Sequence, residues 1–449
     1  MYVIDRCVVY LRGEDDIKMS WRNSRDTTIA NIVQQSTSIL IFLAVPNLLS
    51  VEGYGQVVFV GTLLSFMTFA DLGMSFVYGR KMPAIYASGD VQEVRVWNET
   101  IFTFRLYTGL LFGIVIGVVY FFKYQAILNA ALLISIPPLT VVTSFYVEQN
   151  TALLDFSTYR KVNSFQAIVR LVTIPGTMFL GLLGWFLSQV VASLMTLISL
   201  PRKLWYPNEL KLNTALLREY LFEGVLLGAT ATLWAQLLAS GRVFASFLYP
   251  DVVIAEYGLM NAGYQIVGAL IIAAFIPQTV KVYKKIEVSL EEAIEYTFET
   301  ISYAIPVVFA LAIISREAAP FVAGYFFPQY RIDGIILTAL IFSLPVYPLV
   351  VTLGSLLIGR KKTIPYFLLL VFAVLLNGLF VNLAEPYYGY RAAAIAQLAT
   401  LWAYSALLLA LVFYIFRGFI EKKTNKLLKI YGSILGLYAS YFLVKYVLF

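Results

Sequence analysis

Apolar runs of about 20 residues follow one another along almost all of this 449-residue chain, and the lysines and arginines between them fall on alternate connecting segments. Twenty-five of the 33 basic residues lie on one set of segments and four on the opposite set, while Arg105, Arg170, Arg242 and Arg316 fall inside the runs. Cytoplasmic loops of membrane proteins carry the excess of Lys and Arg. The sorting therefore predicts a multi-pass protein of the plasma (inner) membrane with a cytoplasmic N-terminus.

The apolar runs are expected to cross the bilayer as helices. Backbone polar groups in hydrocarbon must be hydrogen-bonded within the segment, and a barrel would instead require alternating strands of about ten residues. A turn at Leu182–Leu183 is needed, because without it the charge alternation fails at Arg202. We therefore predict thirteen spans, at residues 29–50, 56–79, 101–122, 126–147, 163–182, 183–200, 222–248, 257–277, 300–323, 334–358, 363–384, 391–416 and 430–448.

The first twelve predicted spans divide into six and six, and similar turns, Glu52–Gly55 and Ala255–Gly258, close the first hairpin of each half. Because six is even, the halves form a parallel repeat. We expect an all-α polytopic membrane protein with two six-helix bundles around a central cavity and one extra C-terminal hydrophobic helix. Its predicted parts are a cytoplasmic N-terminal segment (1–28), an N-lobe (29–200), a cytoplasmic interlobe linker (201–221), a C-lobe (222–417), and a basic stretch with the C-terminal hydrophobic helix (418–449).

Composition excludes several classes of function. With 60% hydrophobic and 13% charged residues, a water-soluble domain is not expected, and the net charge of +7 fits short loops beside anionic lipid headgroups rather than nucleic acid. The chain has no histidine, so it has no imidazole base or ligand, and its single cysteine, Cys7, forms no intramolecular disulfide. No nucleotide-binding or metalloprotease motif occurs. We expect no enzyme activity, no cofactor and no metal.

One connecting segment has a charge pattern of its own. In residues 278–299, Lys281, Lys284 and Lys285 are followed by Glu287, Glu291, Glu292 and Glu295. The pattern predicts an amphipathic helix that lies on the inner surface of the membrane.

The four arginines inside the spans are candidate substrate-binding residues. Arg170 lies about seven residues into its predicted span, near 10 Å deep, and Arg242 about six residues from an outer end. A guanidinium in a hydrated cavity suits phosphate oxygens, but a structural ion pair or an interfacial anchor explains these two residues equally well. Arg105 is shallower, which favours snorkelling to the interface, and Arg316 adjoins Glu317, which favours the outer interface.

Asp71 is an acid inside the second predicted span, within the sequence Phe69-Ala70-Asp71-Leu72-Gly73. Ionisable residues at membrane depth are expensive and usually functional or paired. Asp71 is therefore a candidate for binding a coupling proton or sodium ion, and it is equally a candidate ion-pair partner of Arg105 or Arg170. The ion pair is the favoured interpretation.

Amides and hydroxyls form stripes on two predicted helices. Asn31, Gln34, Gln35 and Ser38 share one face of the first span, while Asn261 and Gln265 are an i, i+4 pair on the eighth. A polar stripe in a membrane helix forms either a seam with another helix or the wall of a cavity. The first hairpin of each predicted half thus carries polar residues. This correspondence favours a cavity between the lobes. We therefore include Asn31, Gln34, Gln35, Asn261 and Gln265 among the candidate substrate-binding residues.

With these motifs the chain resembles the polysaccharide (O-antigen) flippases of the multidrug/oligosaccharidyl-lipid/polysaccharide exporter superfamily. The likeness covers about residues 20–417 and is carried by the opening helix from Asn31 to Pro46, the turns at 52–55 and 256–258, the 69–73 motif followed by Gly79-Arg80, and Gly359-Arg360-Lys361-Lys362. The thirteenth hydrophobic segment departs from the common twelve-span layout of the family.

The resemblance implies a function as well as a fold. It implies movement of a polyprenyl-pyrophosphate-linked oligosaccharide from the cytoplasmic to the outer leaflet, by alternating access, for cell-surface polysaccharide assembly. The implied partners are this lipid-linked substrate, membrane lipids, a coupling ion (H⁺ or Na⁺) and polysaccharide assembly proteins. Cavities in the family tend to be cationic, in agreement with Arg170 and Arg242.

Two other functions stay open. An ion-coupled drug or cation antiporter of the same superfamily has the same layout but typically places an acid in the first span, where residues 29–50 have none. A membrane polysaccharide polymerase or glycosyltransferase usually has a long outer loop with catalytic side chains, and no long outer loop is predicted here. Both are less favoured than the flippase.

Overall fold

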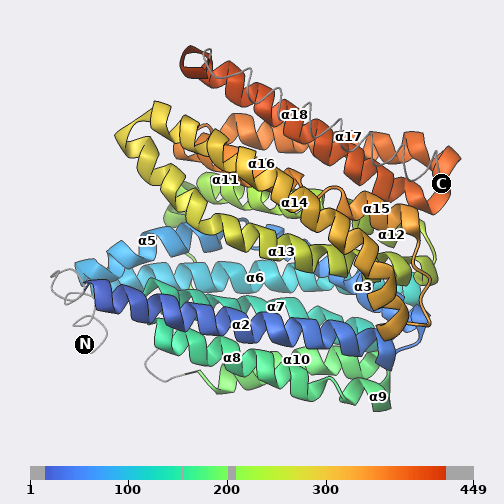
Figure 1. The fold of residues 1–449 in the computed structure, drawn as a ribbon. Helices are drawn as coiled ribbons and strands as arrows, with labels where there is room; N and C mark the ends of the chain where they lie inside the picture. Colours follow the sequence, from blue (N-terminus) through green and yellow to red (C-terminus); the bar gives the residue numbers. More distant parts are fainter. Residues whose placement is uncertain (1–15, 154, 201–208, 421–449) are drawn as a thin grey trace. The chain divides into compact units, whose positions relative to one another are not determined.

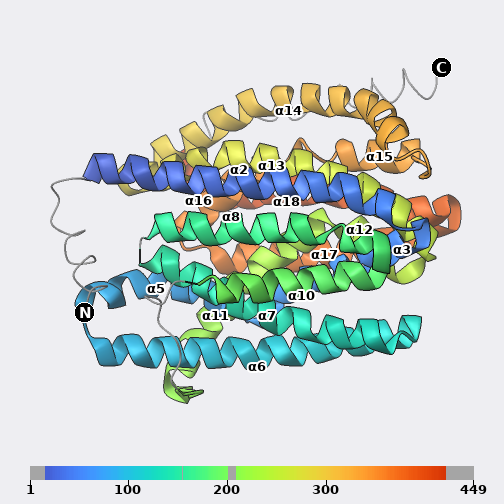
Figure 2. The same ribbon diagram turned by 90° about the horizontal axis from the view of Figure 1, so that it is seen from below.

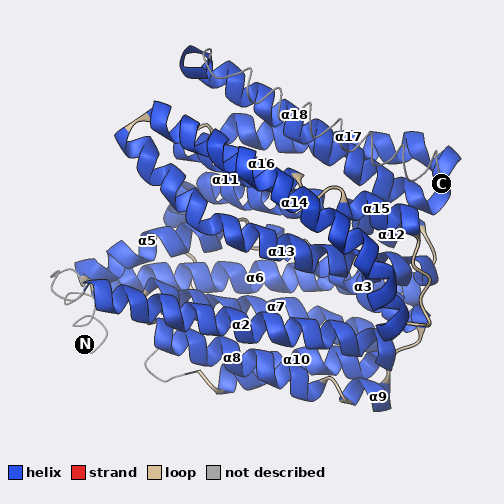
Figure 3. Cartoon of the chain, viewed as in Figure 1, coloured by secondary structure: helices blue, strands red, loops and turns tan. Residues whose placement is uncertain are grey.

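The computed structural model describes residues 16–153, 155–200 and 209–420. All regular structure in these ranges is helical (Figure 3), and eight segments are long and apolar enough to cross a membrane. The predicted all-α polytopic membrane fold is therefore confirmed. The start of the predicted N-terminal segment, residues 201–208 of the predicted linker and the predicted helix 430–448 lie outside the described residues.

The chain forms two compact units. The first contains the chain up to Thr232 together with Pro250–Ala255, and the second contains Leu233–Tyr249 and the chain from Glu256 onward. The first division falls inside one helix, α11 (Thr214–Leu238).

In the first unit, α6 lies along α7, α2 along α8, and α10 against both α7 and α8 (Figures 1 and 2). Gly109, Gly113 and Gly117 form a stripe of small residues on α6, and a Cβ at Gly113 would lie 2.3 Å from the carbonyl oxygen of Ile134 on α7. Such stripes let membrane helices approach closely. The helices are α2 (Asp16–Leu48), α3 (Val51–Ser65), α4 (Met67–Ala70), α5 (Met74–Ser88), α6 (Val91–Tyr124), α7 (Ile127–Ala152), α8 (Phe156–Thr173), α9 (Gly176–Leu180), α10 (Leu182–Ile198) and the first part of α11.

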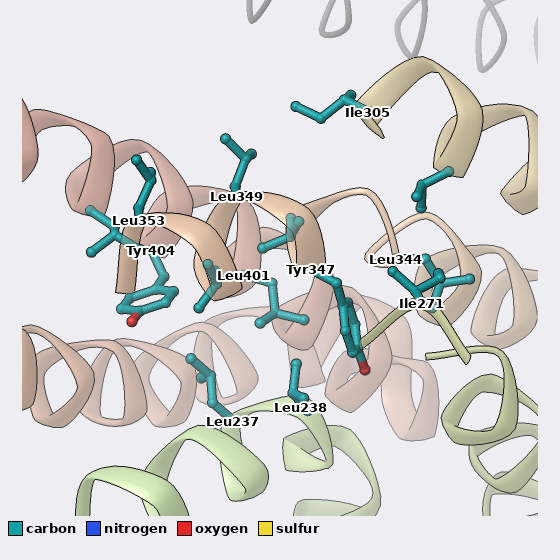
Figure 4. Packing of buried hydrophobic residues seen from close by; sticks show 14 of the residues in the cluster. Leu237, Leu238, Ile271, Ile305, Leu344, Tyr347, Leu349, Leu353, Leu401 and Tyr404 are labelled. Carbon is teal, nitrogen blue, oxygen red and sulfur yellow. The ribbon is translucent and has the colours of Figure 1, made fainter. Parts of the chain in front are cut away.

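In the second unit, α17 lies along α18, while α15 and α16 pack against α14 and α18. Its core is apolar and rich in tyrosine, with Tyr347 and Tyr404 lying among leucines that include Leu237, Leu353 and Leu401 (Figure 4). The helices that follow α11 are α12 (Ser240–Leu248), α13 (Asp251–Val288), α14 (Leu290–Phe326), α15 (Gly334–Ile341), α16 (Val346–Gly359), α17 (Thr363–Tyr388), the short 3₁₀ helix η1 (Gly389–Arg391) and α18 (Ala392–Ile420).

Several predicted spans are broken helices. The span 56–79 divides into α3, α4 and α5, with a break at residues 71–73 that includes two positive φ angles, and the span 222–248 divides into α11 and α12. The predicted turn near Leu182 lies at Gly181, which has φ 57° and separates α9 from α10. Glycine adopts this backbone conformation without steric strain.

The predicted surface helix at residues 278–299 is wrong. The structure continues α13 to Val288 and starts α14 at Leu290, with Ser289 as the N-cap of α14. The charged residues therefore occupy the ends of two long helices, because the apolar stretches on either side propagate the helix into the polar segment.

Candidate functional site

A buried ion pair joins α6 and α7 in the first unit. Arg105 on α6 donates through Nη1 to Glu148 Oε2 at 2.6 Å and through Nη2 to Glu148 Oε1 at 3.1 Å. Its Nη2 also donates to Ser144 Oγ at 2.8 Å, one helical turn before Glu148 on α7. The Arg105 side chain is 3% exposed and that of Glu148 is 26% exposed. The guanidinium therefore holds Glu148 with two hydrogen bonds and does not snorkel as the sequence favoured.

Asp71 completes this buried charge cluster, which consists of Asp71, Arg105 and Glu148. Its Oδ2 lies 3.7 Å from Arg105 Nε, and its side chain is 8% exposed. Its Oδ1 accepts a 2.8 Å hydrogen bond from the backbone N–H of Gly73. Two carboxyl groups thus face one guanidinium, so the cluster has a net charge of −1 when all three groups are ionised.

The chain turns sharply at Asp71 because Leu72 and Gly73 have φ angles of 48° and 70°. Gly73 packs directly on the backbone of α11, where a Cβ at position 73 would lie 1.9 Å from the carbonyl oxygen of Gly224. The backbone nitrogen of Gly228, one turn later on α11, would be 2.8 Å from the same Cβ. The break that positions Asp71 therefore also packs on α11.

Glu148 was missed by the sequence analysis. It lies one residue beyond the predicted span 126–147, where an acid is expected to reach water, and its partner Arg105 is far away in the chain. A weak signal was available, since Ser144 and Glu148 are spaced i, i+4 and share a helix face.

Arg170 lies on α8 and is half-buried. It follows buried Asn163 and Ala167 along the same face of that helix and precedes buried Ile174. Among the described residues, no hydrogen bond or ion pair involves its guanidinium, and its Nε is a buried donor without an acceptor. A cation in this environment requires an anion or water to stabilise its charge.

The second unit holds the other two arginines. Arg316 on α14 donates from Nε to Thr338 Oγ1 at 2.7 Å and lies 3.9 Å from Glu317, so its contacts are local. Arg242 lies near the start of α12 and is half-buried. The four arginines inside the predicted spans thus belong to different environments. Arg105 is paired, and Arg170 has no partner among the described residues. Arg242 is half-buried on α12, and Arg316 is bound to neighbouring side chains.

The polar stripe of the first span is exposed. Asn31, Gln34, Gln35 and Ser38 all lie on the accessible face of α2, whereas Ala30, Thr37 and Val45 are buried. The polar residues of α13 differ from them. Asn261 is completely buried, with no hydrogen-bond partner for either its Nδ2 or its Oδ1, and Gln265 is half-buried.

A separate ionic contact lies at the start of α15, in the loop between membrane helices. Asp333 caps this helix, accepting hydrogen bonds from the backbone N–H groups of Ile335 and Ile336, and its Oδ2 accepts from Arg391 Nε at 2.7 Å and Tyr390 Oη at 2.8 Å. Burial alone raises the pKa of Asp333, but these hydrogen bonds outweigh it and hold the pKa below the usual value. In the described part of the chain, no group of three or more His, Cys, Asp or Glu side chains is placed to hold a metal ion.

Comparison with solved structures shows the fold. The chain is similar to "Lipid II flippase MurJ, inward closed conformation", with a TM-score of 0.62, 13% sequence identity and 92% coverage of each chain. It is also similar to an inward-facing multidrug resistance MATE family transporter of the MOP superfamily, with a TM-score of 0.59, 15% identity and coverage of 88% of this chain and 96% of that one.

A third similar structure is a MOP superfamily transporter from Pyrococcus furiosus, with a TM-score of 0.54, 17% identity and coverage of 92% of this chain and 98% of the other. No protein-family model and no curated protein sequence matches the chain. Likeness at such low identity shows architecture alone. This chain has the fold of the MOP-superfamily transporters.

Proposed function

We propose that this protein is a transporter that flips a polyprenyl-pyrophosphate-linked oligosaccharide from the cytoplasmic to the outer leaflet by alternating access. The observation that carries the proposal is the Arg170 guanidinium, which has no anionic partner among the described residues although it is half-buried on α8. A pyrophosphate supplies the missing anion, and its oxygens match the donor geometry of a guanidinium.

The exposed stripe on α2 supports a sugar-bearing substrate. Four polar side chains at Asn31, Gln34, Gln35 and Ser38 would be unfavourable against lipid tails, because their donors and acceptors would lose the hydrogen bonds that water provides. A hydrated cavity removes this penalty, and amides hydrogen-bond sugar hydroxyls as well as water. The polyprenyl tail stays in lipid while the polar head crosses through the cavity.

We assign different roles to the candidate residues. In the first unit, Arg170 binds the pyrophosphate and the α2 stripe binds sugar hydroxyls. In the second unit, we assign phosphate binding to Arg242 and hydrogen bonding to sugar hydroxyls to Gln265. Arg316 and Asn261 support the cavity wall, since the first is bound to Thr338 and the second is buried. Arg105 is occupied by Glu148 and belongs to the charge cluster rather than to the substrate site.

The remaining parts of the proposal concern context. We place the protein in the plasma (inner) membrane with a cytoplasmic N-terminus, because the basic residues are sorted to alternate connecting segments. We assign it two six-helix lobes, 29–200 and 222–417, joined by the linker 201–221. Its partners are membrane lipids, a coupling ion and the proteins that assemble the polysaccharide, and its work is transport rather than enzyme catalysis.

A second candidate function is an ion-coupled antiporter for drugs or other cations. The likeness to MATE family transporters favours it. The Arg170 guanidinium attracts an anionic lipid headgroup and repels a soluble cation. The effect of removing this charge therefore separates the two functions.

The test uses purified protein reconstituted in proteoliposomes with a fluorescent polyprenyl-pyrophosphate oligosaccharide. Wild-type protein should move the probe between leaflets faster than protein-free vesicles do, and Arg170→Ala should abolish the increase. Lys161→Ala is the matched control, since Lys161 is an exposed cation on the same helix and should not affect the rate. No movement of the lipid probe, combined with transport of a soluble cation that survives Arg170→Ala, would overturn the flippase in favour of the antiporter.

A further inference from the structure

A cavity of about 490 Å³ lies in the first unit between α5, α6 and α11, and none of the candidate substrate-binding residues lines it. Its apolar lining includes Ile85 of α5 and Leu216 of α11. Its aromatic lining is formed by Trp97 of α6 and Tyr220 of α11, whose ring centroids are 5.1 Å apart. A cavity of this volume is large enough for a small molecule or the head of a lipid.

The fold itself holds the walls of this cavity in place. Asn213 caps the start of α11, because its Oδ1 accepts hydrogen bonds from the backbone N–H groups of Ala215 and Leu216, each at 3.1 Å. The backbone N–H of Asn213 donates to Thr100 Oγ1 on α6 at 3.2 Å. Trp97, on the same helix as Thr100, is 4% exposed and belongs to the apolar core of this unit. The start of α11 is therefore fixed on α6, with the cavity between them.

The cavity lies at the level of the lipid headgroups. Helix α6 has 34 residues and is roughly 50 Å long, whereas the hydrocarbon core of a bilayer is about 30 Å thick. Glu93 and Trp97 lie in the first two turns of α6, and Glu219 and Tyr220 lie in the first two turns of α11. Both helices are long and apolar enough to cross a membrane, so their first turns reach the interface. Trp and Tyr are enriched at that interface.

Three ionised side chains from three helices line the cavity. They are Lys81 of α5, Glu93 of α6 and Glu219 of α11. None of them forms an ion pair with another described residue, whereas Arg80, next to Lys81 in the chain, is paired with Glu223. The cavity thus offers one cation and two carboxylates. This pattern complements a ligand that carries both a positive and a negative group.

The lining also indicates which kind of positive group fits. A quaternary ammonium is recognised by open aromatic faces. Here Lys81 Nζ lies 5.0 Å from the centroid of the Tyr220 ring, and Trp97 is nearly inaccessible, so the aromatic faces are engaged within the protein. The carboxylates of Glu93 and Glu219 accept hydrogen bonds, which a primary ammonium supplies through three N–H donors. Lys81 in turn provides the positive charge that attracts a phosphate.

We propose that this cavity binds the headgroup of a zwitterionic phospholipid with a primary ammonium, namely phosphatidylethanolamine. The ammonium binds Glu93 and Glu219, and the phosphate binds Lys81. Ile85 and Leu216 provide apolar contacts for the glycerol and the first carbons of the acyl chains. Free phosphoethanolamine has the same headgroup chemistry, but the apolar lining and the position at the interface favour the lipid. The proposal goes beyond the proposed function, because none of these residues is assigned to the transported substrate.

The test measures lipid binding to purified, delipidated full-length protein by native mass spectrometry and needs no transport, so its result does not depend on the flippase. Phosphatidylethanolamine should bind wild-type protein about tenfold more tightly than phosphatidylglycerol with the same acyl chains, because only the first lipid supplies an ammonium to the carboxylates. Phosphatidylcholine should also bind more weakly, since its ammonium has no N–H donor. Equal binding of phosphatidylethanolamine and phosphatidylglycerol would overturn the proposal, and equal binding of phosphatidylcholine would overturn the assignment of a primary ammonium.

The variant Glu93→Gln combined with Glu219→Gln should lower the affinity for phosphatidylethanolamine about tenfold and abolish the preference over phosphatidylglycerol. Both glutamates are exposed and form no ion pair with a described residue, so the variant should fold as wild type does. Glu287→Gln combined with Glu291→Gln is the matched control, since it makes the same change of charge at exposed positions of the second unit. Unchanged affinity in the first variant, or an equal loss in the control, would contradict the site.

Two further measurements complete the assignment. Lys81→Gln should weaken the binding of phosphatidylethanolamine, whereas Arg218→Gln should not, because Arg218 is an exposed cation on α11 that does not line the cavity. Equal effects of these two substitutions would contradict a phosphate at Lys81. Free phosphoethanolamine should displace the lipid only at far higher concentration. Displacement at a concentration similar to that of the lipid would assign the cavity to a soluble ligand and overturn the lipid as its occupant.

Discussion

The two units bury different chemistry. The first unit encloses ionised side chains, with Arg105 3% exposed between two carboxyl groups. The second unit encloses an apolar core with several tyrosines, such as Tyr257, Tyr347 and Tyr404, that are all nearly inaccessible. Among the described residues of this unit, the most buried acid is Asp333, which lies in a loop between α14 and α15. The buried cluster of three charged side chains distinguishes the described part of the first unit, while both units also contain an apolar core.

The largest expected effect comes from breaking the charge cluster. Arg105→Ala leaves Glu148 and Asp71 buried without their cation, and the loss of one partner of a buried ion pair typically costs about 3–5 kcal/mol. The melting temperature of the purified protein should fall sharply. Arg25→Ala is the control, because Arg25 is 64% exposed and its pair with Asp26 should contribute little. Equal melting temperatures of the two variants would contradict the view that the first unit depends on this cluster.

Apolar packing should dominate in the second unit. Leu353 on α16 is completely buried in the core shown in Figure 4, and a Leu→Ala change in such a position costs about 2–5 kcal/mol through lost burial and the remaining cavity. The effect on thermal unfolding should be independent of pH. Leu368→Ala on α17 is the matched control, since Leu368 is exposed. A pH-dependent loss in Leu353→Ala would show that the second unit also contains a charge-sensitive element.

Asn261 is an exception within the second unit and sharpens the comparison. Its amide is completely buried and makes no hydrogen bond, which costs about 1–3 kcal/mol. Asn261→Leu, which has a similar volume, should therefore raise the melting temperature. A lower melting temperature in Asn261→Leu would mean that the amide is hydrogen-bonded in the working protein and would support a direct role in the cavity.

The sequence predicted the helical membrane fold because hydrocarbon thickness imposes a length that apolar runs display directly. It predicted the charge cluster only in part, for two physical reasons. Helix α6 begins at Val91, well before the predicted start at residue 101, so Arg105 lies well inside a long helix and not near its end. Its pairing with Glu148 also depends on how α6 packs on α7, which local periodicity does not determine. Asp71 was identified because an acid inside an apolar run is conspicuous.

The exposure of the α2 stripe illustrates the same limit. Periodicity placed Asn31, Gln34 and Gln35 on one face, but it left open whether that face formed a helix seam or a cavity wall. This point depends on tertiary packing: α2 packs on α8, and the residues of the stripe are exposed. Whether these residues bind substrate stays a prediction.

The smallest expected effect concerns Asp333, whose depressed pKa makes its contribution dependent on pH. A carboxyl group with a folded-state pKa below its unfolded value of about 3.9 stabilises the protein above that value, and the contribution is lost as pH falls through the folded-state pKa. Asp333→Ala removes the helix cap and the contact with Arg391, so it should cost about 1–2 kcal/mol at neutral pH.

The difference between wild type and Asp333→Ala should narrow as the melting temperature is followed from pH 7 to about pH 3, because the wild-type carboxyl loses its charge there. Asp333→Asn separates the contribution of the cap from that of the charge, since asparagine still caps α15 but has no charge. At neutral pH its melting temperature should fall below that of wild type by less than that of Asp333→Ala does. This difference between Asp333→Asn and wild type should disappear at low pH. If the melting temperature of Asp333→Ala lies below that of wild type by the same amount at every pH, the cap alone stabilises this end of α15. The second unit would then have no charge-dependent stability at this site, and the contrast with the first unit would be stronger than the structure indicates.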